Sequence, residues 1–366
     1  MELTLNLDKI QSDNVSKYAK TILDKQNPYK NFKIENYKYA QLHRDIKSET
    51  LLRDIDISEL LKISKNISSL TSNPVDLASD LNLWKYKNDD SFFRVSSLLK
   101  RDTSSINLDL IDDKNLFLDI SQINNNIHFL KSSKNEINLI IMNTKSNDEY
   151  PKSIFFDISN NSNLNVIHFN ISNFKSFLYF ESNLQDNSHL NFVSFQSDNI
   201  HTRNEFYASL NLECNFDLFG LNINNCGVND NYSFIQHLKP SSSSREIFKS
   251  IVEKGAITNF QGKIYVDSIA QKTDGYQMSR SLLLDDISKA NNKPELEIYA
   301  DDVKCSHGST VSKLDEDQIY YFKSRGIDSE MAKKILKKAF IAEIIESVKD
   351  DNLRDYSNNI IESLLT

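Results

Sequence analysis

Between Ile106 and about Ile298 the chain is a succession of short segments in which apolar and polar residues alternate, with no helical pattern between them. INLIIM, LNVIHFNI and LNFVSFQS are typical examples. A period of two places the apolar side chains on one face, so each segment is predicted to be a half-buried β-strand. About ten such strands without intervening helices predict an all-β body and exclude an alternating α/β fold.

The alternation by itself fits a sandwich, a barrel or a parallel β-helix. Only a few polar residues separate the strands, as in SNNSN and LQDNSH, and such short spacers suit stacked coils. Asn is frequent at these turns, where its side chain can form ladders on successive coils. Since the chain has only seven Gly and five Pro, Asn, Asp and Ser are expected to make the turns. The pattern leaves a parallel β-helix and a sandwich open.

Helical patterns flank the β body. Residues 1–100 are predicted to be mostly helical, because apolar residues recur at helical spacing within 15–23 and 51–63. The β body is then expected to occupy residues 101–313, and a second helical region residues 314–366. These three ranges are the expected domains of the chain.

The C-terminal region carries clear helix signals. Asp315 is predicted to cap one helix that stops at Gly326, and Asp328 to cap a longer helix. An apolar stripe runs along 331–345, and an amphipathic segment closes the chain. Periodicity does not decide whether the stripe packs on the chain itself or receives a partner.

Charge and composition exclude several classes of function. The net charge of −8 and the pI of about 5.5 disfavour binding to nucleic acid. No apolar run approaches the ~20 residues of a membrane span, and the N-terminal residues lack a secretory signal pattern. An odd number of scattered cysteines, three in all, agrees with a reducing cytoplasm. We therefore expect a cytoplasmic protein that binds neither membrane nor nucleic acid.

Nucleotide and further nucleic-acid signals are equally weak. The sequence has no GxxxxGK[ST] or GxGxxG motif, so no nucleotide site is expected within the chain. The segment from Ile257 to Leu284 is rich in aromatic and basic residues, but nearby aspartates balance its positive charge. We interpret this segment as a solvated β-face with stacked polar side chains.

The segment ELEIYADDVKCSHGSTV holds the candidate metal ligands Cys305 and His307. In a strand, residues two apart point to the same face, so the thiol and the imidazole would lie side by side. Both groups bind soft or borderline metals, but a tetrahedral site needs four donors. A structural role for the pair is the alternative, since buried Cys packs as a small apolar group. A nucleophilic role is disfavoured, because only Gly308 is near to help build an oxyanion site.

Three features together resemble the SufB/SufD family of iron–sulfur cluster assembly proteins. They are NFQGKIYVDSIAQKTDGYQMSRSLLLDD, then KPELEIYADDVKCSHGSTVSKLDEDQIYYFKSRGI, and a helix containing Ala339 and Phe340. The similarity is strong from Tyr232 to about Ile345, and residues 35–39 carry a weaker echo. The middle strands are divergent in sequence.

The resemblance implies a right-handed parallel β-helix core flanked by N-terminal and C-terminal helical regions, and so favours the β-helix over the sandwich. The Cys-Ser-His-Gly run at 305–308 resembles the SufD branch of the family. SufB has a Glu-His-Glu run there and a cluster-handling cysteine upstream, whereas this chain has no cysteine between Cys226 and Cys305. A non-catalytic SufD-like scaffold is therefore implied. The alternatives are a homodimeric SufB-like scaffold and a carbohydrate-active β-helix enzyme.

The resemblance also implies partners. It implies a heterodimer with SufB through the β-helices, or a homodimer when the chain is isolated, and binding of the SufC ATPase to the C-terminal helices. His307 would face a SufB cysteine as a candidate ligand of the nascent cluster, with Cys305 as a weaker candidate and no cofactor held by this chain alone. The residues expected to dock SufC are Tyr321, Phe322, Arg325, Gly326 and Ile327.

Overall fold

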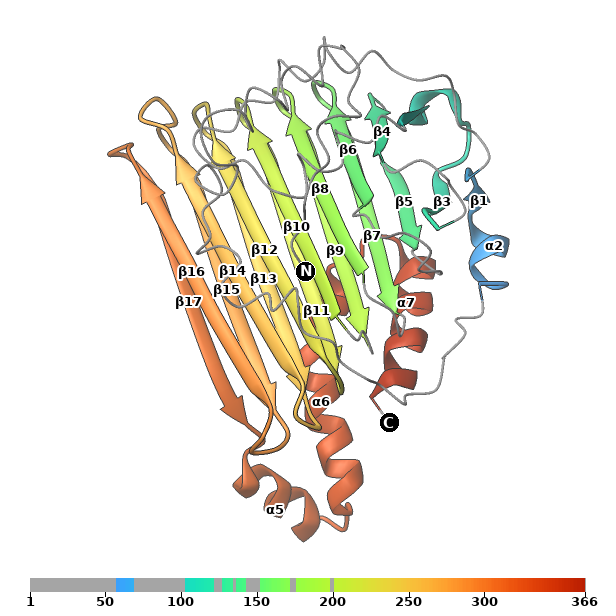
Figure 1. Ribbon diagram of the computed structural model, residues 1–366, viewed down its shortest axis with the longest axis vertical. Helices are drawn as coiled ribbons and strands as arrows, with labels where there is room; N and C mark the ends of the chain where they lie inside the picture. Colours follow the sequence, from blue (N-terminus) through green and yellow to red (C-terminus); the bar gives the residue numbers. More distant parts are fainter. Residues whose placement is uncertain are drawn as a thin grey trace, which may run out of the picture.

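Two parallel β-sheets face each other along the molecule in the computed structural model (Figure 1). The structure describes residues 57–68, 103–121, 127–133, 136–142, 152–171, 176–197 and 201–365. Consecutive strands alternate between the sheets, and each strand pairs in parallel with the second strand before and after it. This is the topology of a parallel β-helix, so that prediction is confirmed and the sandwich is excluded.

The sheets, here named sheet A and sheet B, hold the odd-numbered and the even-numbered strands. Sheet A consists of β1 (Lys65–Asn66), β3 (Asn115–Asp119), β5 (Ile137–Met142), β7 (Asn163–Ile171), β9 (His189–Ser197), β11 (Asn215–Asn224), β13 (Ser243–Val252), β15 (Asp274–Leu283) and β17 (Lys304–Lys313). Sheet B consists of β2 (Thr103–Asn107), β4 (Ile127–Ser132), β6 (Lys152–Ile158), β8 (Ser176–Leu184), β10 (His201–Leu210), β12 (Val228–His237), β14 (Ile257–Val266) and β16 (Lys289–Ile298).

The described helices lie at the two ends of the chain. They are the short α2 (Leu60–Ile63), the 3-10 turn η5 (Leu108–Leu110), and α5 (Glu316–Ser324), α6 (Ser329–Glu346) and α7 (Asp351–Leu364). The helical prediction for residues 1–100 lies outside the described residues except at 57–68. None of the described helices is long and apolar enough to cross a bilayer.

The described chain has more strands than the about ten that the sequence predicts, and two of the differences have a plain cause. The run FYASLNLECNFDLFGLNI reads as one segment, but a turn at 211–214 divides it into β10 and β11. β13 escapes the prediction because charged residues such as Glu246 and Lys249 interrupt its apolar pattern, and both are buried in the structure.

The space between the sheets holds an apolar core of stacked aromatic rings. The rings of Phe180 and Phe206 stack with centroids 5.3 Å apart, and Phe192 meets both rings edge-on. All ten residues of β10 are buried, so the prediction of half-buried strands is wrong for the central coils. The reason is that the outer faces of these strands are covered as well, which a single strand's alternation cannot show.

Helices α6 and α7 cover the outer face of sheet A. Outward side chains such as Phe169, Val193 and Leu221 form one apolar cluster with Ile344 and Leu353 of the two helices. The C-terminal half of the α6 stripe, from Phe340 to Ile345, therefore packs on the chain itself. Met331 at its N-terminal end is 52% exposed, so the alternative that periodicity leaves open is resolved only for the C-terminal half.

Polar contacts hold α6 in place on the sheet. The Lys249 ammonium donates to the Phe340 carbonyl oxygen at 2.7 Å, and the Asn191 amide donates to the Ser347 carbonyl oxygen at 3.1 Å. Asp328 caps α6 as predicted by accepting from the Met331 N–H.

The six turns that lead into β5, β7, β9, β11, β13 and β15 of sheet A each contain a residue with positive φ. These residues are Glu136, Asn161, Asn187, Glu213, Ser241 and Lys272. Each donates its N–H to a carbonyl of the following coil, for example Asn187 to Leu212 at 2.9 Å. The expected Asn and Ser occur at half of these positions, while Glu and Lys occupy the rest. The repeated coil-to-coil hydrogen bond offsets the left-handed backbone cost for side chains that rarely adopt it.

The expected Asn ladder is present, but on strands rather than in turns. The Asn165 amide donates to Asn138 at 2.9 Å, and the Asn138 amide donates to Asn115 at 2.8 Å. These residues are in-register neighbours on β7, β5 and β3.

The interpretation of Ile257–Leu284 as a solvated face is wrong for its first strand. Nine of the ten residues of β14 are buried, and Lys263 is half-buried. β15 is mixed, with Gly275, Gln277 and Ser279 buried between more exposed residues.

Candidate functional site

The last coil of the β-helix is an open end. Within the described part of the chain, β17 pairs only with β15, and β16 pairs only with β14, so both strands are sheet edges (Figure 1). Each edge is ten residues long. An edge strand presents a row of unpaired N–H and C=O groups that another chain can pair with.

Cys305 and His307 lie on β17 and point to the same face, as the sequence predicts. Their in-register neighbours on β15 are Gly275 and Gln277, whose buried positions face the space between the sheets. In-register residues of parallel strands share a face, so both candidate ligands face the interior side of the open end. His307 is exposed there, and Cys305 is half-buried.

The surroundings of Cys305 are largely apolar. Its side chain packs against a small cluster that contains Ile264, Val266 and Ala300. Burial raises the pKa of the Cys305 thiol, and the nearby Asp274 carboxylate raises it further, while a hydrogen bond from the Gly275 backbone lowers it. The thiol is consequently protonated at neutral pH, whereas a metal binds the thiolate.

These two side chains can supply at most half of a tetrahedral donor set. Across the described ranges, from 57–68 through 201–365, the structure brings no three or more His, Cys, Asp or Glu side chains together in a metal-binding arrangement. The remaining donors of any site at β17 would have to come from outside this set.

Two buried histidines away from this edge, His168 and His237, have structural surroundings. His237 bonds to the hydroxyls of Ser242 and Ser244 at 2.6 and 2.9 Å, and burial lowers its pKa to about 3. His168 is fully buried, contacts the Ser194 hydroxyl at 3.0 Å and has a pKa lowered to about 3 by burial. Neutral imidazoles held by hydroxyls explain both positions without a ligand.

The predicted docking residues cluster at the end of α5. The Arg325 guanidinium stacks over the Tyr321 ring at 5.3 Å, and the Phe322 ring packs edge-on against Tyr321. Gly326 ends the helix with φ of 82°, and the Ile327 N–H donates back to the Phe322 carbonyl oxygen at 3.1 Å. Asp315 caps the helix by accepting from the Asp317 N–H.

Two further apolar side chains at this place escape the sequence prediction of docking residues. Tyr320 is 74% exposed and Met331 is 52% exposed, beside Tyr321 at 56%. The sequence signal for Tyr320 is the pair of adjacent tyrosines in DQIYYF. Consecutive residues of a helix point in different directions, so both tyrosines cannot pack on the same buried side and one of them is expected to be exposed. We name these three residues the α5 surface.

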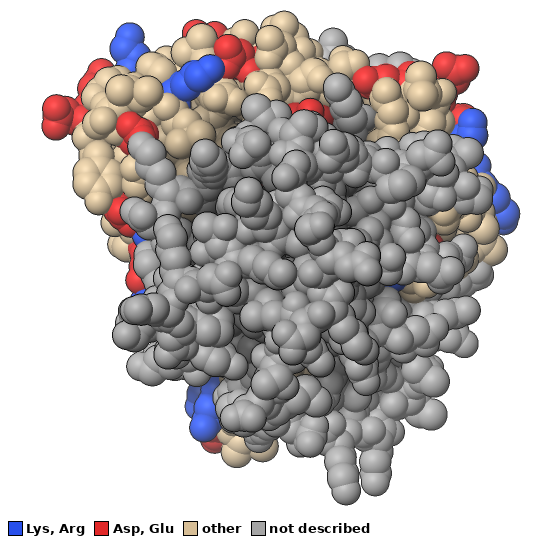
Figure 2. Space-filling model, turned by 45° about the horizontal axis from the view of Figure 1, so that its top comes forward, with Lys and Arg blue, Asp and Glu red and all other residues tan. Residues whose placement is uncertain are grey.

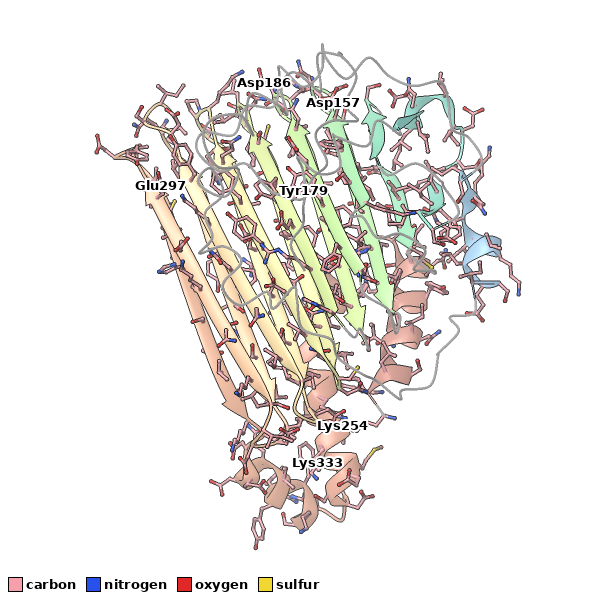
Figure 3. The ribbon with its side chains drawn as sticks, in the orientation of Figure 1. Asp157, Tyr179, Asp186, Lys254, Glu297 and Lys333 are labelled. Carbon is pink, nitrogen blue, oxygen red and sulfur yellow. The ribbon has the colours of Figure 1, made fainter. Side chains whose placement is uncertain are left out.

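Charged side chains near the β16 edge are paired. The Lys263 ammonium on β14 forms an ion pair with Glu297 on β16, and the Tyr299 hydroxyl donates to the same carboxylate at 2.9 Å. Figure 3 labels Glu297 at this edge of the molecule. Acidic and basic side chains are interspersed over the described surface visible in Figure 2.

Comparisons with known proteins agree with this arrangement. The SufBD core domain of the SUF iron–sulfur cluster assembly system matches residues 124–340, which is more than half of the chain. The chain is 42% identical over 127 residues to iron–sulfur cluster assembly protein SufD of Escherichia coli, covering 35% of this chain and 30% of that protein. It is 43% identical over 127 residues to chloroplastic protein ABCI7 of Arabidopsis thaliana, covering 34% and 27% of the two chains.

A third relative extends the similarity along more of the chain. Iron–sulfur cluster assembly protein SufD of Plasmodium berghei is 26% identical over 367 aligned residues, covering 83% of this chain and 27% of that protein. The chain thus spans less than a third of the length of each of these relatives. From the extent of the core-domain match and the β-helix that carries it, the chain belongs to the SufBD family of the SUF iron–sulfur cluster assembly system.

Proposed function

We propose that this chain is a SufD-like, non-catalytic scaffold subunit whose last coil supplies one part of a shared cluster-building site. The observation that carries the proposal is the position of His307 and Cys305 on an edge strand, facing the inside of the open end. Two donors on an unpaired edge are what a site between two chains requires of one of them. The membership of the SufBD family supplies the chemistry of the cargo, an iron–sulfur cluster.

The proposed partner at this edge is SufB, a second member of the same family. Two β-helices of one family have the same spacing between strands, so the free edges of β16 and β17 suit continuation of both sheets. When SufB is absent, the same edges would support a homodimer. Pro294 on β16 lowers the tendency of this edge to pair at random, because proline has no N–H to donate.

His307 is the stronger of the two proposed cluster ligands. Its imidazole is exposed at the open end, where a partner's donor can approach. Cys305 is half-buried in an apolar cluster and its thiol pKa is raised, so it must lose a proton before it can bind iron. A cluster bound at the edge would therefore use the His307 ring nitrogen in preference to the Cys305 sulfur.

The α5 surface is the proposed docking place of the SufC ATPase, together with Phe322, Arg325, Gly326 and Ile327. Exposed tyrosine, methionine and arginine side chains are typical of residues that dominate protein interfaces. α5 contributes one buried residue, Ile319, so most of its surface is free for a partner. Movement of SufC would be transmitted through α6, which is bonded to sheet A by Lys249. We expect this assembly to operate in the cytoplasm.

The test is anaerobic cluster reconstitution in a complex of the chain with SufB and SufC. His307→Ala is expected to lower the cluster yield by about tenfold, the cost of one lost ligand. Cys305→Ala is expected to lower it by less than about twofold, which tests the order of the two proposed ligands. Unchanged yield with His307→Ala would remove this residue from the proposed site.

Copurification tests the partners separately. The chain is expected to copurify with SufB and with SufC, and Tyr320→Ser with Tyr321→Ser is expected to release SufC alone. A pure chain that binds neither subunit would contradict the scaffold proposal.

A further inference from the structure

A row of three polar side chains runs along the inside of sheet A to its open end. Glu246 on β13 is in register with Gln277 on β15, and Gln277 is in register with His307 on β17. Glu246 and Gln277 are fully buried, whereas His307 is exposed. In-register residues of adjacent parallel strands have their side chains stacked on one face about 4.8 Å apart. In the same row the preceding strands of sheet A carry Phe192 and Leu218, so the row changes from apolar to polar at Glu246.

Hydrogen bonds fix the inner end of the row. The Gln277 amide nitrogen donates to Oε2 of Glu246 at 2.9 Å, and the Ser233 hydroxyl donates to the same oxygen at 2.6 Å. The nitrogen and the oxygen of an amide lie on opposite sides of its carbon. Because the Gln277 nitrogen bonds toward β13, its oxygen lies on the side of β17, as in a side-chain amide ladder.

The Gln277 oxygen has no hydrogen-bond partner within the described chain, although it is buried. Buried carbonyl oxygens in native proteins nearly always accept a hydrogen bond. The next side chain in the row, and on the same face, is the His307 imidazole.

The fold makes room for the Gln277 amide in this orientation. A Cβ atom at Gly262, on the facing strand β14, would lie 2.2 Å from the Gln277 amide nitrogen and 2.7 Å from the Phe260 ring. Any larger residue at 262 would displace the amide. The absence of a side chain there is therefore part of the arrangement.

We propose that Gln277 is a positioning residue for His307: rotation of the exposed imidazole would bring one ring N–H to the unpartnered Gln277 oxygen and leave the other ring nitrogen free. Glu246 holds the Gln277 amide in the required orientation from the coil below. This role rests on the proposed function of His307 as a ligand. Histidine ligands are commonly oriented in this way, by an acceptor for the ring N–H that does not bind the metal.

Glu246 performs its part in either protonation state. Burial raises the pKa of its carboxyl to about 7, so both forms are present near neutral pH. Its Oε1 atom has no partner and can carry the proton, while Oε2 continues to accept from Ser233 and Gln277. The amide orientation is thereby kept.

The test uses the chain alone, with 15N-labelled histidine, and measures the His307 ring signals by NMR at one fixed pH. His307→Gln assigns the signals. In the wild-type chain we expect one dominant tautomer, with a ring N–H protected from exchange with water. Gln277→Met keeps the volume but removes the acceptor, and is expected to speed this exchange about three- to tenfold.

Two variants make the result decisive. The double variant Glu246→Gln with Gln277→Glu exchanges the two side chains. The carboxylate at 277 can accept from the His307 ring N–H, and the amide at 246 can donate to that carboxylate. We therefore expect the His307 ring N–H to be protected from exchange again. Ser281→Ala, on the same face of β15 but opposite Val311, is the matched control and is expected to leave His307 unchanged. If Gln277→Met does not fold, the swap variant alone decides, since loss of protection there overturns the proposal.

Identical His307 spectra in wild type and Gln277→Met would also overturn the proposal, as would an equal change caused by Ser281→Ala. Because no cluster and no partner are present, this outcome is independent of the reconstitution experiment. A positioned His307 that proves unnecessary for cluster yield would contradict the proposed function and leave the role of Gln277 intact.

Discussion

The central coils and the last coil of this β-helix have strands of the same length but opposite burial. Every residue of β10 and β12 is buried, while no residue of β16 or β17 is buried. The central strands have neighbours on both edges and on both faces, and the last coil lacks a neighbour on one edge within the described chain. The difference shows that burial in a solenoid depends on the position of a coil in the stack more than on the strand itself.

The interior changes along the same direction. Phe180 and Phe206 fill it in the central coils, whereas Glu246, Gln277 and His307 occupy it toward the open end. Along sheet A the row that ends in Glu246, Gln277 and His307 begins with Phe192 and Leu218, so it changes from apolar to polar toward the open end.

The largest effect should come from a direct test of this contrast. Phe206→Ala removes a fully buried ring and is expected to lower the free energy of unfolding by about 3–5 kcal/mol. Val311→Ala on β17, where the side chain is 49% exposed, is expected to change it by less than about 0.5 kcal/mol. Urea unfolding of both variants measures the difference. Equal losses would show that the last coil is packed as tightly as the centre.

The pH dependence of the free energy of unfolding tests the polar row of Glu246, Gln277 and His307. The folded-state pKa of Glu246 is raised from 4.5 to about 7 by burial. Between these values the folded state retains a proton that the unfolded state has lost, so this stabilisation is complete below pH 4.5 and is lost as the pH rises through 7. Glu246→Gln is expected to remove about 2–3 kcal/mol of this decline between pH 5 and pH 8.

Urea midpoints of wild type and Glu246→Gln at several pH values provide the measurement. The buried histidines contribute equally to both proteins, so the difference isolates Glu246. Parallel curves for the two proteins would mean that the Glu246 carboxylate is ionised in the folded state throughout the range.

The smallest expected effect on stability comes from adding a methyl group at a closely packed glycine. Gly262→Ala places a methyl group against Gln277 and the Phe260 ring and is expected to cost about 1–3 kcal/mol. Gly308→Ala on β17 meets the flexible end of Met278 at 2.8 Å and is expected to cost less than about 1 kcal/mol. Thermal unfolding compares the two. If adding Gln277→Ala does not relieve Gly262→Ala, the amide is not the group that fills this space.

Part of the site was predictable from local pattern. The spacing of two between Cys305 and His307 places them on one face in any strand, and Asp328 and Gly326 mark helix boundaries that the structure confirms. The exposure of Tyr321 also follows from its place on a short helix with one apolar anchor. These features depend on neighbours within a few residues.

Other parts were not predictable in this way. The buried charges of β13 look like a surface segment, and nothing near Gln277 in the sequence points to Glu246, which lies 31 residues away. The pairing depends on the register between coils. Register is a property of the whole stack, since each coil is aligned by the turns and side-chain ladders of the coil before it.

The sequence by itself determined the strands, the helix caps and the face shared by Cys305 and His307, because the backbone period and the capping residues act over short distances. Only the tertiary structure decided that the central strands are buried on both faces, that β17 is a free edge, and that Glu246 and Gln277 lie in line with His307. Those properties arise when separate coils stack in register. Each residue then acquires neighbours that its own segment does not contain.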